Sequence, residues 1–131
     1  MTEFKYTILY VEDVKAALSF YEKAFGFTTK FIAPDESYGE LNMGETTLSF
    51  AAKTLAKSNL KDGFIESNLK NKPFGIEIGF TTDNVEATVN TAVEAGATII
   101  EYPKTSSWGQ VIAYVRDPDG FLIEVCTPME V

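Results

Sequence analysis

An internal repeat of 71 residues constrains the fold of this chain more than any other feature. A shift of the sequence by 71 positions places Val14 on Val85 and Leu18 on Val89, so that two amphipathic helix patterns coincide. One segment before each helix pattern and three after it alternate apolar with polar residues, which is typical of strands. Two copies that each contain a sheet predict paired βαβββ modules and not a solenoid.

We expect the 131 residues to form a single domain of the α+β class. Module one spans residues 4–52, a linker or mobile lid spans 53–73, and module two spans 74–127. The linker is rich in Lys, Asn and Ser, which favours a long connection with a turn of helix. In module one, Asp13 should cap the helix and Gly26 should end it. In module two we assign the cap to Asp83, because Glu86 follows three residues later.

The sequence Asp-Pro-Asp-Gly at residues 117–120 predicts a tight turn between the last two strands. Proline presets its own φ and Gly120 tolerates a positive φ, so the chain should reverse direction there. In the strand that follows, Ile123 and Val125 share one face and Glu124 lies on the other. A carboxylate in the middle of a closing strand is unusual and points to a role for this second face.

Each module has one helix, which we expect to cover the aliphatic face of its own sheet. Ile76, Ile78 and Phe80 form this face in the first strand of module two. If the two sheets pair edge to edge, they form a curved mixed sheet with helices outside, and their inner faces line a cleft. These inner faces carry phenols, three carboxylates and no Lys or Arg: Tyr6, Tyr10, Tyr38, Glu40, Asn42, Thr47, Ser49, Glu77, Thr81, Gln110, Tyr114 and Glu124. The pattern predicts an acidic, aromatic-lined pocket, and a solvated face that is acidic by chance is the alternative.

Composition excludes several functional classes. The formal net charge of −8 disfavours nucleic acid as a partner and suits either a cationic partner or solubility alone. There is no histidine, so the commonest metal ligand and the commonest general base are absent. Arg116 is the only arginine, which nearly excludes bidentate clamps on anions. With no membrane-spanning apolar run, no signal-peptide pattern and Cys126 as the only cysteine, we expect a cytoplasmic protein.

The chain resembles the vicinal oxygen chelate superfamily. The resemblance lies in the paired modules, in the segment VEDVKAALSFYEKAFGF at residues 11–27 and in the closing segment WGQVIAYVRDPDGFLIEV at 108–125. It covers nearly the entire chain and is weakest at residues 53–73. It implies the glyoxalase/bleomycin resistance fold, in a group that includes glyoxalase I, bleomycin-resistance proteins, fosfomycin-resistance transferases and extradiol dioxygenases. This fold hosts several chemistries, so the resemblance specifies the fold better than the function.

In the enzymes of this superfamily, a divalent metal is held by side chains from the first and fourth strands of each module. The resemblance carries these positions onto Tyr6, Ser49, Glu77 and Glu124. Without histidine this set is weak for Ni²⁺, Zn²⁺ or Fe²⁺, whereas its two carboxylates suit a hard ion such as Mg²⁺ or Mn²⁺. The cleft also lacks the basic residues with which glyoxalase I and the fosfomycin transferases hold anionic substrates.

We therefore expect a small-molecule-binding protein similar to the bleomycin-resistance group. It should sequester a cationic or neutral aromatic compound without a cofactor and form a homodimer. The expected ligand-binding residues lie on the inner faces or at their rim: Tyr6, Tyr38, Glu40, Ser49, Glu77, Trp108, Tyr114 and Glu124. Trp108 enters a strand from a loop, and the sequence leaves open whether it lies at the pocket rim or in the core.

The alternative is a divalent-metal-dependent lyase or dioxygenase of the glyoxalase I or extradiol type, with a remodelled, histidine-free site. Glu77 and Glu124 would then be ligands, and Tyr6 would be a ligand or an acid/base. Two close carboxylates without a metal should raise the pKa of one of them by like-charge repulsion. A third hypothesis is a structural or interaction protein, because sheet edges must be covered and dimerisation is the common means.

Overall fold

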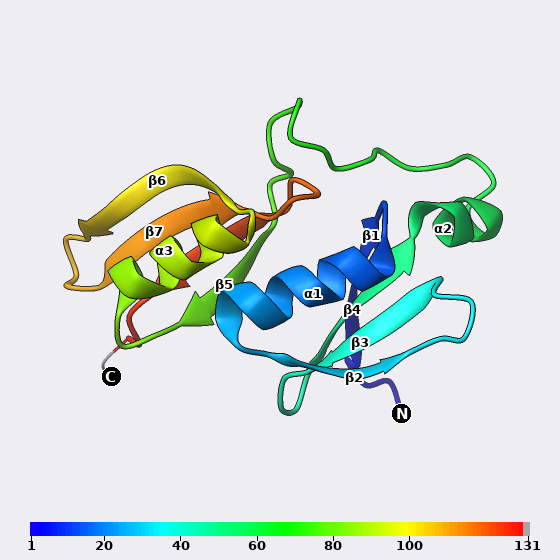
Figure 1. Cartoon of the computed structure of the whole chain (residues 1–131), viewed down its shortest axis with the longest axis horizontal. Helices are drawn as coiled ribbons and strands as arrows, with labels where there is room; N and C mark the ends of the chain where they lie inside the picture. The colour runs from blue at the N-terminus through cyan, green and yellow to red at the C-terminus, as the bar shows by residue number, and fades with distance from the viewer. Residues whose placement is uncertain (130–131) are drawn as a thin grey trace. The chain divides into compact units, whose positions relative to one another are not determined.

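The computed structural model describes residues 1–129, which divide into two compact units of the same topology. Unit 1 comprises residues 1–22 and 26–66, and unit 2 comprises residues 23–25 and the chain from residue 67 onward. The order of elements is βαβββ, one short helix, then βαβββ (Figure 1). The α+β class and the repeated module are thus confirmed. Among residues 1–129, no helix is both long and apolar enough to cross a membrane.

Unit 1 contains a four-stranded sheet. Its elements in chain order are β1 (Tyr6–Val11), α1 (Val14–Phe25), β2 (Thr28–Ile32), β3 (Tyr38–Asn42), β4 (Thr47–Ala52) and α2 (Lys53–Asn59). The strand order is β1-β4-β3-β2. The β1–β4 pair is parallel and the other pairs are antiparallel. The last residues of α1, 23–25, group with unit 2.

Unit 2 repeats this arrangement. Its elements are β5 (Glu77–Thr81), α3 (Val85–Ala95), β6 (Thr98–Thr105), β7 (Val111–Arg116) and β8 (Leu122–Cys126). The strand order is β5-β8-β7-β6, and β5 runs parallel to β8. Leu9 is opposite Phe50 in unit 1, and Phe80 is opposite Val125 in unit 2. Leu9 and Phe80 are 71 positions apart, so the sequence repeat is a structural repeat.

Helix α1 packs closely on one face of the sheet in unit 1. A Cβ atom at Gly39 of β3 would lie 2.7 Å from Leu18 Cδ1 and 3.2 Å from Val14 Cγ1, so the glycine lets these helix side chains approach the strand closely. The ring of Tyr21 is buried with its centroid 5.2 Å from that of Phe50 on β4. Because α1 covers this face, the polar side chains of β3 and β4 lie on the opposite face.

The two helices begin at equivalent residues. The Asp13 side chain accepts a hydrogen bond of 3.0 Å from the Ala16 N–H, as expected. In unit 2 the cap is Asn84, which accepts a 3.0 Å bond from the Ala87 N–H, so the assignment to Asp83 is wrong by one residue. The shift of 71 places Asp13 on Asn84, and the same hydrogen bond therefore forms in both units.

The first strand of unit 2 is shorter than the sequence predicts. Strand β5 begins at Glu77, where its ladder with Leu122 starts, so Ile76 lies outside the sheet and is 72% exposed. The expectation that Ile76 packs under the helix is wrong. The strand begins late because its partner β8 begins only after the tight turn at residues 117–120.

The connection at residues 53–73 is fastened at both ends. In unit 1, Lys53 forms ion pairs of 3.1 Å with Glu12 and 3.2 Å with Glu66. The Phe64 ring makes an edge contact with Tyr10, with centroids 4.8 Å apart. If this segment moved as a lid, these contacts would have to break. The lid stays a prediction.

The turn at residues 117–120 holds the other end of the connection in unit 2. Gly120 has a φ of 92° and donates a hydrogen bond of 2.9 Å to the Asp117 carbonyl, which confirms the predicted turn. Arg116 donates to the carbonyls of Gly120 at 2.9 Å, Asn71 at 2.8 Å and Asn68 at 3.0 Å. The only arginine of the chain is therefore a structural residue that joins the turn to the connection.

Candidate functional site

The predicted site residues divide equally between the two units. Unit 1 contains Tyr6, Tyr38, Glu40 and Ser49, and unit 2 contains Glu77, Trp108, Tyr114 and Glu124. The cleft expected between the sheets stays a prediction.

In unit 1, neighbouring strands place the polar residues on one face. Glu40 on β3 is directly opposite Ser49 on β4, and Ser49 is opposite Ile8 on β1. Residues opposite each other in a sheet project to the same side, as do residues two apart along a strand. Tyr38 therefore shares this face with Glu40, and Tyr6 shares it with Ile8.

Tyr38 and Glu40 form a hydrogen-bonded pair. The Tyr38 hydroxyl donates to Glu40 Oε2 at 2.7 Å, and Glu40 is only 7% exposed. Burial, followed by the bond to Glu40, raises the pKa of Tyr38 to about 12. The phenol is therefore protonated at neutral pH and acts as the donor. Within residues 1–129, no Lys or Arg forms an ion pair with Glu40.

Ser49 is the least satisfied polar residue of this group. Its side chain is fully buried, and its Oγ makes no hydrogen bond of acceptable length and angle with residues 1–129. The hydroxyl lies near that of Tyr38 and lowers the pKa of that phenol, against the larger effects of burial and Glu40. Buried polar atoms without partners are rare in native proteins, so this hydroxyl requires an explanation.

In unit 2, the hydroxyl and the carboxylate across the sheet satisfy each other. Tyr114 on β7 is directly opposite Glu124 on β8 and donates to Glu124 Oε1 at 3.0 Å. Gly79 on β5 is opposite Glu124 on its other side, so Glu77, two residues earlier, shares the face. The structure thus brings together Glu77, Glu124 and Tyr114.

The electrostatics of this group favour proton binding. Glu77 is exposed, but partial desolvation raises its pKa, and the charge of Glu124 and a hydrogen bond shared with it add to the shift. The bond to Glu124, followed by burial, raises the pKa of Tyr114 to about 12. Burial, followed by Glu124, also raises the pKa of Cys126. Each of these groups resists acquiring a further negative charge, as expected for neighbours of a carboxylate that lacks a counter-ion.

The comparison with protein families identifies the superfamily of the chain. Residues 3–125 match the family model described as Glyoxalase/Bleomycin resistance protein/Dioxygenase superfamily. The chain belongs to this superfamily.

Two solved structures and one further protein are similar to most of the chain. A glyoxalase-related enzyme from Fulvimarina pelagi superposes with a TM-score of 0.82 at 18% identity, covering 98% of this chain and 89% of the other. A superfamily enzyme from Burkholderia phytofirmans gives 0.81 at 20% identity, covering 98% and 100%. Virulence protein STM3117 of Salmonella typhimurium is 26% identical over 122 residues, 90% of this chain and 78% of that protein. At these identities the solved structures establish the fold alone.

Tyr6, Ser49, Glu77 and Glu124 are the residues expected from the resemblance at the metal positions, and their donor chemistry does not fit a transition metal. The set offers a phenol, a hydroxyl and two carboxylates, whereas Zn²⁺, Ni²⁺ and Fe²⁺ favour imidazole or thiolate ligands. The Tyr114 hydroxyl also occupies one oxygen of Glu124. Among residues 1–129, no three His, Cys, Asp or Glu side chains are placed to share a metal ion.

Trp108 lies outside the acidic group. It is 64% exposed in the β6–β7 loop, so the hypothesis that it fills the core is wrong. Its Nε1 donates to Gln110 Oε1 at 2.6 Å, and this is its only polar contact within residues 1–129. The loop that joins these two strands is exposed to solvent, so the indole cannot pack in the core from there. A role for Trp108 at a pocket rim stays a prediction.

Sequence reasoning missed Phe31, Glu101 and Cys126. Phe31 on β2 is opposite Glu40, with its ring centroid 5.9 Å from that of Tyr38. A register shift between Thr29 and Phe31 hides this position from simple alternation. Glu101 on β6 is opposite Tyr114 beside similar register shifts. Cys126 is two residues after Glu124, so alternation alone could have placed it on this face.

The expectation that the inner faces carry no basic residue is also wrong. Lys104 on β6 is opposite Ile112, which shares the face of Tyr114, and Arg116 shares it by alternation. Neither forms an ion pair with Glu77 or Glu124 within residues 1–129. Arg116 is held by three backbone carbonyls, so the acidic group keeps its uncompensated charge.

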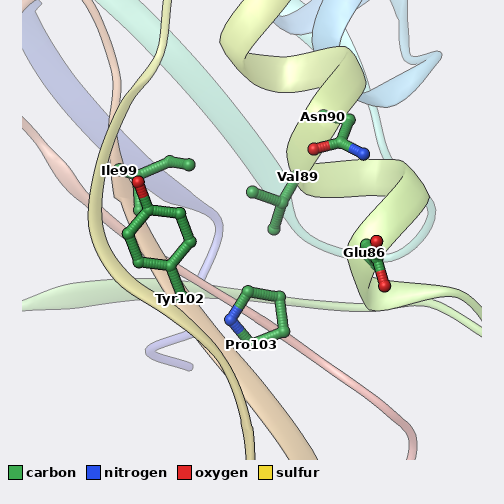
Figure 2. A pocket seen from close by; sticks show the side chains of 6 residues that line it. All are labelled: Glu86, Val89, Asn90, Ile99, Tyr102 and Pro103. Atoms are coloured by element: carbon green, nitrogen blue, oxygen red, sulfur yellow. The ribbon is translucent and has the colours of Figure 1, made fainter.

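A groove of about 310 Å³ lies elsewhere in unit 2, between α3 and β6 (Figure 2). Figure 2 shows its walls to be side chains of the helix and of the strand: Glu86, Val89, Asn90, Ile99, Tyr102 and Pro103. None of these residues belongs to the predicted site. Tyr102 is 75% exposed, and the groove is a surface depression that contains none of the residues with shifted pKa values.

Proposed function

We propose that this protein is a small-molecule-binding member of the superfamily that holds a cationic, aromatic compound without a metal ion. The observation that carries the proposal is the Glu77–Glu124 pair. Partial desolvation and the charge of Glu124 raise the pKa of Glu77, and no basic side chain of residues 1–129 forms an ion pair with either carboxyl. An organic cation between the carboxyls would relieve this repulsion.

The phenol of Tyr114 supports the aromatic part of the proposal. Its hydroxyl is fixed by Glu124 at 3.0 Å, so its ring is held beside the acidic group. A cation near an aromatic face gains electrostatic attraction in addition to its ion pair, by roughly 0.5–2 kcal/mol. The net charge of −8 would also raise the rate at which a cation approaches the protein.

A homodimer remains part of the proposal. In unit 1 the sheet ends in β1 and β2, and in unit 2 it ends in β5 and β6. Terminal strands present unpaired backbone groups, which a second copy can cover. Sedimentation equilibrium at micromolar concentration would test this part, and a monomer would contradict it.

Isothermal titration with benzylamine, a protonated aromatic amine, tests the ligand class. Benzyl alcohol is the uncharged control probe. We expect heat with the amine and none with the alcohol, and an affinity about 10-fold weaker in Glu124→Gln, because one charge-assisted contact contributes about 1.5–3 kcal/mol. Glu94→Gln, an exposed position on α3, is the matched control. No heat with the amine, or the same affinity in Glu124→Gln, would contradict the proposal.

A thermal melt tests the metal-dependent alternative. Chelator-treated protein is compared with protein in excess Mg²⁺, Mn²⁺, Ni²⁺ or Zn²⁺. A ligand at about 100 times its Kd stabilises the folded state by roughly 2.7 kcal/mol, which is a shift of several degrees. We expect no shift. A shift that disappears in Glu124→Gln would favour a lyase or dioxygenase with a remodelled site.

A further inference from the structure

We infer that Glu40, Ser49 and Tyr38 of unit 1 form a binding position for the protonated primary amine of a ligand. The inference rests on the proposed function, since it assumes a cationic ligand, and it adds a second amine position in unit 1 to the one proposed at Glu77 and Glu124. It is carried by two features of unit 1 that the fold alone does not explain.

The first feature is a buried carboxylate without a counter-ion. Glu40 is 93% buried, the complement of its 7% exposure, and its one hydrogen bond within residues 1–129 comes from the Tyr38 hydroxyl to Oε2. Burying a charge is costly unless it is paired and fully hydrogen-bonded. An apolar residue at position 40 would avoid this cost, so the carboxylate requires a role beyond packing.

The second feature is the orphaned hydroxyl of Ser49. The residue is fully buried and directly opposite Glu40, yet its Oγ makes no hydrogen bond of acceptable length and angle, and the Tyr38 hydroxyl near it donates to Glu40 instead. Both side chains project to the face that α1 leaves uncovered, because α1 packs against Gly39 on the other face. The free acceptors of Glu40 and Ser49 are therefore adjacent and point to the same side of the sheet.

The free groups match an ammonium. The Tyr38 hydrogen is already committed to Glu40 Oε2, which leaves Glu40 Oε1 and Ser49 Oγ as acceptors. A primary ammonium has three donors and no acceptor, and it carries the single positive charge that one carboxylate needs. A neutral amide would leave the charge of Glu40 uncompensated, and a divalent ion would require more carboxylates than this face of unit 1 supplies.

The surrounding rings fit an organic cation. Phe31 lies opposite Glu40, with its ring centroid 5.9 Å from that of Tyr38. Phe31 is 45% exposed and Tyr6 is 53% exposed, so the aromatic border of the position is accessible. Such rings attract ammonium groups and the apolar part of an amine ligand.

Unit 2 shows how the equivalent hydroxyl and carboxylate can bond to each other across the strands. At the equivalent strand pair of unit 2, the hydroxyl of Tyr114 reaches Glu124 across the sheet at 3.0 Å. In unit 1 the hydroxyl opposite the acid belongs to Ser49, which does not bond Glu40. The same fold thus satisfies its cross-strand pair in one unit and leaves it open in the other.

Benzylamine titration of three variants tests the inference, with Tm measured in the absence of ligand. We expect Glu40→Gln to weaken amine affinity at least 10-fold and Ser49→Ala to weaken it at least 3-fold. Ser49→Ala should also raise the Tm, because it removes a buried hydroxyl without a partner. Glu45→Gln, an exposed acid in the β3–β4 turn, is the matched control and should leave the affinity unchanged.

The combination of readouts separates binding from folding. If Ser49→Ala lowers the Tm and leaves the affinity unchanged, Ser49 is structural and the inference is wrong. If Glu40→Gln fails to fold, the Ser49→Ala affinity alone decides the outcome in the same way.

The combination of variants also separates this inference from the proposed function. If Glu124→Gln abolishes amine binding while Glu40→Gln and Ser49→Ala do not change it, the proposed function stands and this inference is wrong. If benzylamine does not bind at all, both are wrong. Weaker binding in both Glu40→Gln and Ser49→Ala supports the inference, whatever Glu124→Gln does.

Discussion

Tyr114 donates a 3.0 Å hydrogen bond to Glu124, the residue directly opposite it in the β7–β8 pair. The equivalent pair in unit 1 also joins an acid and a hydroxyl, Glu40 and Ser49, but on exchanged strands. The repeat therefore conserves the polar character of this position within the chain while changing which strand supplies the charge. The two units consequently differ in what they can bind, although their topology is the same.

Two tyrosines should ionise late in an alkaline titration. Hydrogen bonding and burial raise the pKa values of Tyr38 and Tyr114 to about 12. The chain has six tyrosines. After a rapid pH jump to 11, the tyrosinate absorbance should therefore be lower than the value for six ionised tyrosines. Tyr38→Phe and Tyr114→Phe should each remove one residue from the late phase. Full ionisation at pH 11, before unfolding, would contradict these hydrogen bonds.

Glu77→Gln should stabilise the protein at neutral pH. The folded-state pKa of Glu77 is raised above its ordinary value of 4.5, so the folded protein binds this proton more tightly than the unfolded chain does. The resulting stabilisation is complete below the unfolded pKa and is lost as the pH rises through the folded pKa. We expect a higher Tm than wild type at pH 7 and little difference at pH 4. A control, Glu94→Gln, changes the same charge on the exposed side of α3. Equal Tm values for Glu77→Gln and wild type at pH 7 would count against the repulsion.

Gly120→Val should destabilise the protein more than Gly26→Val does. Both glycines have positive φ, 92° and 77°, so any side chain carries a strain of about 1–3 kcal/mol. A Cβ at Gly120 would also lie 2.7 Å from the Asn68 carbonyl carbon, whereas a Cβ at Gly26 meets no atom within 4 Å. Urea unfolding should show a larger loss at position 120, and equal losses would refute the close approach.

The sequence predicted most of the fold because the repeat and the alternation are local signals. The helices, the turn at residues 117–120 and the positive φ of Gly120 followed from them. The wrong predictions concern the ends of a strand and of a helix, which depend on contacts with other residues and not on the local pattern alone. Ile76 is outside the sheet because β8 begins at Leu122, and the helix cap is Asn84 although Asp83 has the same chemistry.

The site was predicted less completely than the fold, because pairing across strands depends on register. Alternation placed Glu124 and Tyr114 on one face, and the structure adds the hydrogen bond that joins them. Phe31 and Glu101 lie beside register shifts, where a period of two no longer identifies the face. Nothing in the sequence could show that the Ser49 hydroxyl lacks a partner, because that depends on distances and angles between strands.

Arg116→Lys should loosen the connection at residues 67–73 as well as lower the stability of the protein. The guanidinium donates to three backbone carbonyls between 2.8 and 3.0 Å, and a lysine ammonium cannot reproduce this planar fork. Each charge-assisted bond contributes about 1.5–3 kcal/mol, so we expect a loss of roughly 3 kcal/mol in urea unfolding. Cleavage by a protease within residues 67–73 should become faster, because Asn68 and Asn71 are then no longer held. Lys70→Arg, at an exposed position of the same segment, is the control for the reverse change. An unchanged urea midpoint together with unchanged cleavage would mean that the turn and the connection are held by other contacts.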